Sequence, residues 1–261
     1  MKEDNMFAML EKLYDAYVDT YRDAEGRLPD MMQLKREHTG FVLQNARLIA
    51  EGESFSAAER EASEAAALLH DTGRYEQLRR YNTFRDSASV DHAVFSRDIV
   101  RDLGWLDGRG DSAAVLKAIL YHNRRDLPDD MDALTAVAAK TVRDADKLDI
   151  FRVLETLVAK PGWQEDRTAF WNLEILGAPN PEVVRAIEER RPVDYQCILT
   201  LADFVLIQVG WMISGLYFAT SRRLCAERGH LAFRRGFLHR LTDDPAIDRI
   251  CSLGERSLQG G

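Results

Sequence analysis

The stretch Ala65-Ala66-Ala67-Leu68-Leu69-His70-Asp71-Thr72-Gly73-Arg74 decides how the rest of the chain is interpreted. An alanine-rich apolar segment runs directly into an imidazole and a carboxylate, which a glycine and an arginine follow. Groups of this kind leave water only at a cost unless they find a hydrogen-bond partner or a metal ion. We therefore interpret His70-Asp71 as half of a metal site and expect its other ligands elsewhere in the chain.

The spacing of apolar residues is helical along most of the chain, which predicts an all-α protein. Ser56-Ala57-Ala58-Glu59 has the form of a capping box and opens the helix that leads to His70. The predicted buried face of that helix consists of small residues and one leucine, namely Ala58, Ala62, Ala65, Ala66 and Leu69. Small side chains let a neighbouring helix approach closely, so this helix is expected to lie inside the fold.

Length and composition are those of an ordinary globular protein. The chain has 261 residues, of which 46% are hydrophobic and 30% are charged. It contains no low-complexity linker and no internal repeat. We predict a single all-α domain over residues 1–261, with a helical C-terminal extension at about 162–256.

The net charge of -8 argues against a sequence-specific nucleic-acid binder or a protein that binds anionic membranes. Residues 198–220 are long and apolar enough to span a bilayer, but Asp203, Gln208 and Ser214 interrupt them. We predict a buried core helix there and no membrane association. The arginine-rich residues 222–240 are predicted to form a solvated helix face.

The cellular compartment is predicted from two features. The three cysteines are widely spaced and form no CxxC pair, which favours buried thiols in a reducing compartment. The first residues lack the basic start and apolar run of a secretory signal. We expect a cytoplasmic protein.

Further candidate ligands occupy inward-facing positions or ends of predicted helices. Four of the six histidines lie between residues 38 and 122, and they are His38, His70, His92 and His122. Three aspartates compete for a final ligand position. Asp146 shares a helix face with apolar residues, Asp149 follows one turn later, and Asp144 lies on a face that should be wetter because it carries two lysines.

This order resembles the HD superfamily of metal-dependent phosphohydrolases, whose pattern is H…HD…D, in the version with two additional histidines before the last aspartate. The resemblance covers about residues 34–153, the predicted metal-binding core. The segment Ala145-Asp146-Lys147-Leu148 is similar to the closing motif of the family. The resemblance implies an HD-domain-like helical bundle with additional C-terminal helices, with Asp146 as the last ligand and Asp149 in contact behind it.

The resemblance also implies two metal ions that share Asp71. One ion would be held by His38, His70, Asp71 and Asp146, and the other by Asp71, His92 and His122. If the last two histidines do not bind, the site is mononuclear. Imidazole ligands favour a divalent transition metal, Mn or Fe ahead of Zn or Ni, while Co and Mg are also possible.

The implied activity is that of a phosphohydrolase acting on a nucleotide or another small phosphoester through a metal-activated hydroxide. Asp71 and Arg74 are the predicted catalytic residues. Arg74, Lys147 and Arg124 are the predicted substrate-binding residues, because a guanidinium fork or an ammonium suits phosphate. Two alternatives stay open. One is a mixed-valent di-iron oxygenase similar to the inositol and phosphonate oxygenases, and the other is a non-catalytic, metal-stabilised binding module. The sequence does not indicate an oligomeric state.

Overall fold

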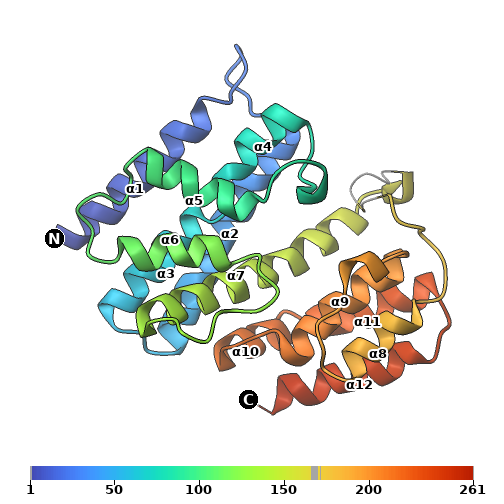
Figure 1. Ribbon diagram of the computed structural model, residues 1–261. Coiled ribbons are helices and arrows are strands. Elements are labelled where there is room, and N and C mark those ends of the chain that lie inside the picture. Colours follow the sequence, from blue (N-terminus) through green and yellow to red (C-terminus); the bar gives the residue numbers. More distant parts are fainter. Residues whose placement is uncertain (1, 166–169, 171, 261) are drawn as a thin grey trace. The chain divides into compact units, whose positions relative to one another are not determined.

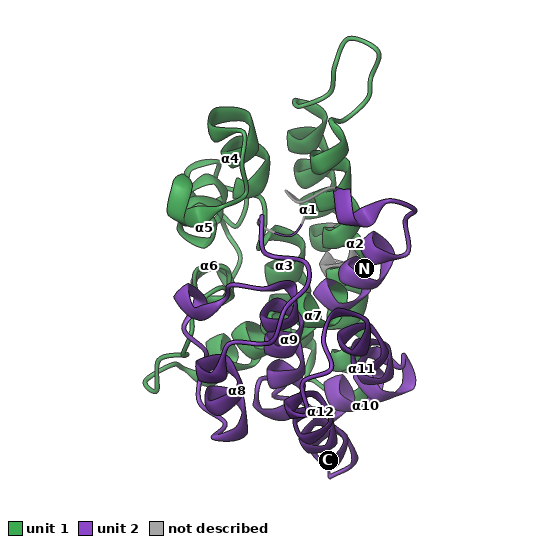
Figure 2. Cartoon of the chain, turned by 90° about the vertical axis from the view of Figure 1, so that its right-hand side faces the viewer, with its two compact units in different colours: residues 1–149 green, residues 150–261 purple. Residues whose placement is uncertain are grey.

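The computed structural model describes residues 2–165, 170 and 172–260, and these residues form helices joined by turns (Figure 1). Within these residues the only β pairing is an isolated bridge between Glu174 and Thr200. The prediction of an all-α fold is therefore confirmed. The chain divides into two compact units, Met1–Asp149 and Ile150–Gly261, coloured green and purple in Figure 2. The single domain stays a prediction.

Unit 1 is built around α3, which packs against α1, α2 and α6. A second set of contacts joins α4 to α2 and α5, and α5 to α6. The helical elements of this unit, with α7 continuing into the next unit, are α1 (Lys2–Asp19), α2 (Asp30–Gly52), α3 (Ala57–Leu69), α4 (Gly73–Tyr81), the short 3-10 helix η1 (Asp86–Ala88), α5 (His92–Asp102), α6 (Ser112–Tyr121) and α7 (Ala133–Val158).

Helix α3 begins with the predicted capping box. The Ser56 hydroxyl accepts a hydrogen bond from the Glu59 backbone, and the Glu59 carboxylate accepts one from the Ser56 backbone. Burial then starts at Ala62, and the alanines that follow are fully enclosed. Ala58 is exposed, so its predicted burial is wrong; it lies in the first turn, before the buried part of the helix begins.

Residues 75–88, predicted as a surface loop or a broken helix, form α4 and η1. Tyr75, Glu76 and Gln77 on α4 are buried, so this segment belongs to the core more than expected. Asn82 ends α4 with a left-handed φ of 52° while its N–H bonds to the Leu78 carbonyl. The chain then turns back toward the start of α5.

Gly73 marks a close approach between α4 and α5. An alanine Cβ there would lie 2.7 Å from the Ser96 backbone nitrogen and 3.1 Å from the His92 carbonyl oxygen. We expect Gly73→Ala to lower the free energy of unfolding by about 1–3 kcal/mol, because backbone atoms must shift. Gly40→Ala is the matched control in the interior of α2, where a Cβ meets nothing within 4 Å. This control should be neutral or stabilising by about 0.5–1 kcal/mol. Urea unfolding distinguishes the two, and equal effects would contradict the close contact.

Unit 2 is built around α9, which packs against α8, α11 and α12. Besides the end of α7, its elements are η2 (Trp163–Glu165), α8 (Pro181–Glu188), η4 (Tyr195–Cys197), α9 (Leu201–Ser214), α10 (Ala219–Glu227), α11 (His230–Leu241) and α12 (Ala246–Gln259). Helix α8 begins at the predicted Asn180-Pro181, where the Asn180 side chain accepts a hydrogen bond from the Glu182 backbone.

The apolar residues 198–220 do not form one helix. They contain α9, a turn at Gly215 and the start of α10. Asp203, the only charge in that stretch, forms a capping box with Thr200 and is fully buried. No helix among the described residues is long and apolar enough to cross a membrane.

The arginine-rich residues 222–240 are not wholly solvated, because Arg234 on α11 is completely buried. Its Nη1 donates to Glu155 Oε1 at 2.8 Å, and its Nε donates to Gln208 Oε1 at 3.0 Å. Its Nη2 donates to the Phe151 carbonyl oxygen at 3.0 Å. The predicted solvated face is wrong at this position, since acceptors from α7 and α9 replace water around the guanidinium.

Unit 2 should lose stability in acid partly through Glu155. Burial acts to raise the pKa of this carboxyl group, but hydrogen bonds from His230 and Arg234 outweigh it and leave the pKa below the ordinary value of 4.5. A lowered pKa stabilises the fold above the ordinary value, and this stabilisation disappears as the pH falls through the lowered value. The stability advantage of the wild type over Glu155→Gln should therefore shrink below about pH 4.5. Urea midpoints measured from pH 7 to pH 3 test this, and a constant difference would contradict it.

Candidate metal centre

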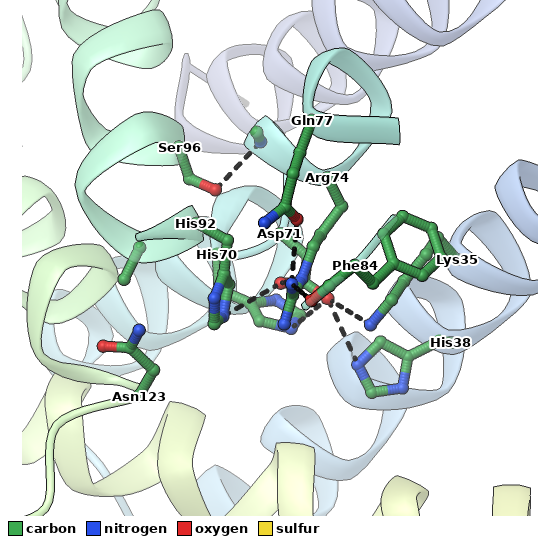
Figure 3. Close-up of polar contacts among 12 residues, drawn as sticks. Lys35, His38, His70, Asp71, Arg74, Gln77, Phe84, His92, Ser96 and Asn123 are labelled. Atoms are coloured by element: carbon green, nitrogen blue, oxygen red, sulfur yellow. Dashed lines mark hydrogen bonds and ion pairs between the residues drawn. The ribbon is translucent and has the colours of Figure 1, made fainter. Parts of the chain in front are cut away.

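The six predicted ligands converge within unit 1, and Figure 3 shows His38 and His70 with Asp71 between the helices that carry them. Each ligand comes from a helix or a helix end. His38 lies on α2, the His70-Asp71 pair follows α3, and Asp146 lies on α7. The other two are His92, the first residue of α5, and His122, which follows α6. All four imidazoles are buried.

Two of the imidazoles are oriented by their own helices. The His70 Nδ1 donates to the Ala67 carbonyl oxygen at 2.8 Å, and the His122 Nδ1 donates to the Ile119 carbonyl oxygen at 2.7 Å. Because a carbonyl only accepts, each Nδ1 carries the proton. In the neutral ring the Nε2 lone pair is then free to bind a metal ion.

Carboxylates orient the other two imidazoles. The His38 Nδ1 lies 2.7 Å from Asp149 Oδ2, and the His92 Nδ1 lies 2.5 Å from Asp86 Oδ2. A carboxylate behind a metal-binding histidine selects its tautomer and raises its basicity. The structure thus places Asp149 behind His38, where the sequence predicted a contact. Asp86 was not predicted.

Asp71 lies between two pairs of imidazole nitrogens. Its Oδ2 is 3.7 Å from His38 Nε2 and 3.6 Å from His70 Nε2. Its Oδ1 is 3.7 Å from His92 Nε2 and 3.9 Å from His122 Nε2. Each oxygen of one carboxylate therefore faces a different pair of histidines, an arrangement that suits a ligand shared by two ions.

Asp146 is the aspartate of α7 nearest to the cluster, with Oδ1 3.1 Å from His38 Nε2 and 4.0 Å from His70 Nε2. Asp144 is fully buried, so the expectation that its helix face is wetter is wrong. This part of α7 is enclosed on more than one side, because Thr141 and Leu148 are fully buried as well.

The donor atoms fit divalent metal ions. The Nε2 atoms of His38 and His70 are buried and have no hydrogen-bond partner among the described residues. The Nε2 atoms of His92 and His122 lie 3.0 Å from each other, close to the spacing of neighbouring nitrogen ligands about 2.1 Å from one ion. Two groups of three residues bring donor atoms within 4.8 Å of one another, namely His38 with His70 and Asp146, and His70 with Asp71 and His122.

Electrostatics favours the metal-binding forms of most of these groups. Burial, and for His122 the neighbouring His92 and His70, lowers the pKa of His70 and His122, so both rings are neutral near pH 7. Burial alone would raise the pKa of Asp71, but Lys35, His70 and Arg74 hold it well below its ordinary value. Burial lowers the pKa of His38, but hydrogen bonds to Asp146 and Asp149 outweigh it and raise this pKa. A cation bound there would replace the proton on His38.

Two cationic side chains flank the Asp71 carboxylate (Figure 3). Lys35 Nζ lies 2.8 Å from Oδ2, and Arg74 Nε lies 3.4 Å from Oδ1. Both cations also lie over the Phe84 ring, at 5.5 and 5.6 Å from its centre. The sequence analysis missed Lys35. Its position three residues before His38, on the same face of α2, was the signal that could have identified it.

The other two predicted substrate-binding cations make different contacts. Lys147 Nζ donates to the Arg143 carbonyl oxygen of its own helix at 3.2 Å, and burial together with the Arg143 charge lowers its pKa to about 8. The Arg124 side chain is exposed, and its guanidinium lies over the Tyr121 ring at 5.5 Å. The contacts described for these two residues do not include Asp71.

Helices that direct four histidines and two aspartates toward one buried point define a class of all-α proteins with a metal-binding core. Residues 36–150 match the family model of the HD domain, so this part of the chain is an HD domain. Its bounds agree with the resemblance expected over about 34–153. Comparison with the curated proteins and with the solved structures gave no match. HD domains bind divalent metal ions and are generally metal-dependent phosphohydrolases, which indicates hydrolase-type chemistry for this chain.

Proposed function

We propose that this protein is a metal-dependent phosphohydrolase that acts on a nucleotide or another small phosphoester. The observation that carries the proposal is the position of Asp71, whose two oxygens face two different pairs of imidazole nitrogens. In the proposed site His38, His70, Asp71 and Asp146 hold one ion. Asp71, His92 and His122 hold the second.

A pair of divalent ions would supply a water molecule of lowered pKa and neutralise charge on a phosphoryl group. The chain contributes the cations beside Asp71. The side chains of Arg74 and Lys35 are only 13% and 19% exposed, so an anion that reaches them exchanges water for charged donors. We propose that Arg74 binds phosphoryl oxygens with its planar fork and that Lys35 adds a second positive charge.

The ligand set favours a transition metal over magnesium, which prefers oxygen ligands and keeps several waters. Four neutral imidazoles with two carboxylates suit Mn or Fe, and also Zn, Ni or Co. The proposed partner is a small phosphorylated molecule, in keeping with a chain of net charge -8 that would repel a polyanion such as a nucleic acid.

The test measures phosphate release from a panel of nucleoside mono-, di- and triphosphates, sugar phosphates and small phosphodiesters. Metal-depleted protein is reloaded with Mn²⁺, Fe²⁺, Co²⁺, Ni²⁺, Zn²⁺ or Mg²⁺. We expect hydrolysis that His70→Ala abolishes and that His239→Ala, a change at a 42% exposed side chain, leaves intact. If loaded protein cleaves none of the panel, the proposal fails. Two irons with a mixed-valent paramagnetic signal and oxygen consumption would instead establish the oxygenase, and bound metal with neither activity would establish a binding module.

A further inference from the structure

The segment between α4 and α5 is tied to the metal centre by one carboxylate. Asp86, in η1, receives hydrogen bonds on both of its oxygens. Oδ2 lies 2.5 Å from His92 Nδ1, and Oδ1 accepts from Arg74 Nη1 at 3.0 Å and from Gln77 Nε2 at 3.0 Å. One side chain therefore contacts a proposed ligand of the second ion and the proposed substrate-binding arginine.

The neighbouring contacts hold this carboxylate in place. Gln77 is fully buried, and its Nε2 also donates to the Ser89 hydroxyl and the Val90 carbonyl oxygen. The Arg74 Nη1 that reaches Asp86 also donates to the Phe84 carbonyl oxygen at 2.7 Å. Residues 84–90 are thus fastened to α4 at several points, which leaves the Asp86 carboxylate little freedom to turn away from His92.

A different interpretation would make Asp86, Asp91 and His92 a metal site of their own, since their donor atoms lie within 4.8 Å of one another. Asp91 is already engaged, because its Oδ1 accepts hydrogen bonds from the backbone of Ala93 and Val94 and from Asn123 Nδ2. Asp86 is neutralised by the Arg74 guanidinium. A cation at this place would have to displace these donors and lie near a positive charge.

We infer that Asp86 is a positioning residue that directs His92 Nε2 toward the second metal ion and holds Arg74 beside Asp71. It acts through these two side chains. A protonated Nδ1 facing Asp86 leaves Nε2 as the lone-pair donor on the side of His122 and Asp71. The inference rests on the proposed two-ion site.

Asp149 provides a matched comparison within the same chain. It faces His38 Nδ1 at 2.7 Å, as Asp86 faces His92 Nδ1, but His38 belongs to the proposed first ion. The equivalent partners of His70 and His122 are backbone carbonyls, which substitution cannot remove. Neutralising one carboxylate at a time should therefore weaken one ion at a time.

The experiment titrates metal-depleted protein with Mn²⁺ by calorimetry and counts bound ions by elemental analysis. We expect the wild type to bind two ions. Asp86→Asn should weaken one of them by about 10–100-fold and leave the other unchanged. Asp149→Asn should weaken the other ion, and the combined variant should weaken both. Asp102→Asn, at a 66% exposed side chain, is the control for loss of one charge.

Several outcomes would overturn the inference. Two ions with wild-type affinities in Asp86→Asn would remove any role for Asp86 in metal binding. If His122→Ala keeps the ion that Asp86→Asn loses, and Asp91→Asn loses it too, the ion is held by Asp86, Asp91 and His92 themselves. A wild type that binds two ions but hydrolyses no phosphoester would contradict the proposed function and leave the role of Asp86 standing. Thermal melts of each metal-free variant separate weaker binding from failure to fold.

Discussion

Asp71→Asn should lower phosphoester hydrolysis by about 10³-fold or more and reduce the number of tightly bound ions. The carboxylate is 4% exposed, and each of its oxygens faces two imidazole nitrogens. An amide carries no charge and offers a single oxygen, so neither ion keeps its full ligand set. Metal ions supply several kcal/mol of charge stabilisation in such reactions, and each 1.36 kcal/mol corresponds to a factor of ten.

The measurements for this variant are kcat/KM, bound metal and the melting temperature of the metal-free protein. Melting is needed because asparagine also leaves Lys35 and Arg74 without their shared carboxylate. Asp102→Asn removes the same charge from an exposed position and should change none of the three. A folded Asp71→Asn protein that binds two ions and keeps wild-type kcat/KM would rule out a shared carboxylate.

Arg234→Met should destabilise unit 2 by about 3 kcal/mol, because removing one partner from a buried charged network leaves the others unpaired. The guanidinium is fully buried and donates to Glu155, Gln208 and two backbone carbonyls. Methionine fills similar volume but donates nothing. Glu155 would keep only His230 as a partner, and the buried oxygen of Gln208 would lose its donors.

The neighbouring Arg235 is the control on the same helix. It pairs with Glu255 and Asp248 but is 32% exposed, and exposed ion pairs contribute about 0–1 kcal/mol. Urea unfolding of Arg234→Met and Arg235→Met should differ by about 2 kcal/mol or more. Equal losses would mean that the buried network contributes no more than a surface ion pair.

Local spacing was sufficient for much of the fold. The helical period predicted the all-α class, and the Ser56 and Asn180 signals marked helix starts that the structure contains. Where the expected burial was wrong, the error came from neighbours that are distant in sequence. Asp144 and Arg234 are buried because other helices enclose them, and a pattern along one helix does not report which helices those are.

The candidate site shows the same division. The order of His38, His70-Asp71, His92, His122 and Asp146 could be read from the chain, because each residue sits at an inward position or an end of its own helix. Only the tertiary structure brought Asp86 against His92, Asp149 against His38 and Lys35 against Asp71, the last two across 111 and 36 residues. Helix periodicity is a property of neighbours in sequence, whereas the orientation of an imidazole and the pairing of a buried charge depend on the packing of whole helices.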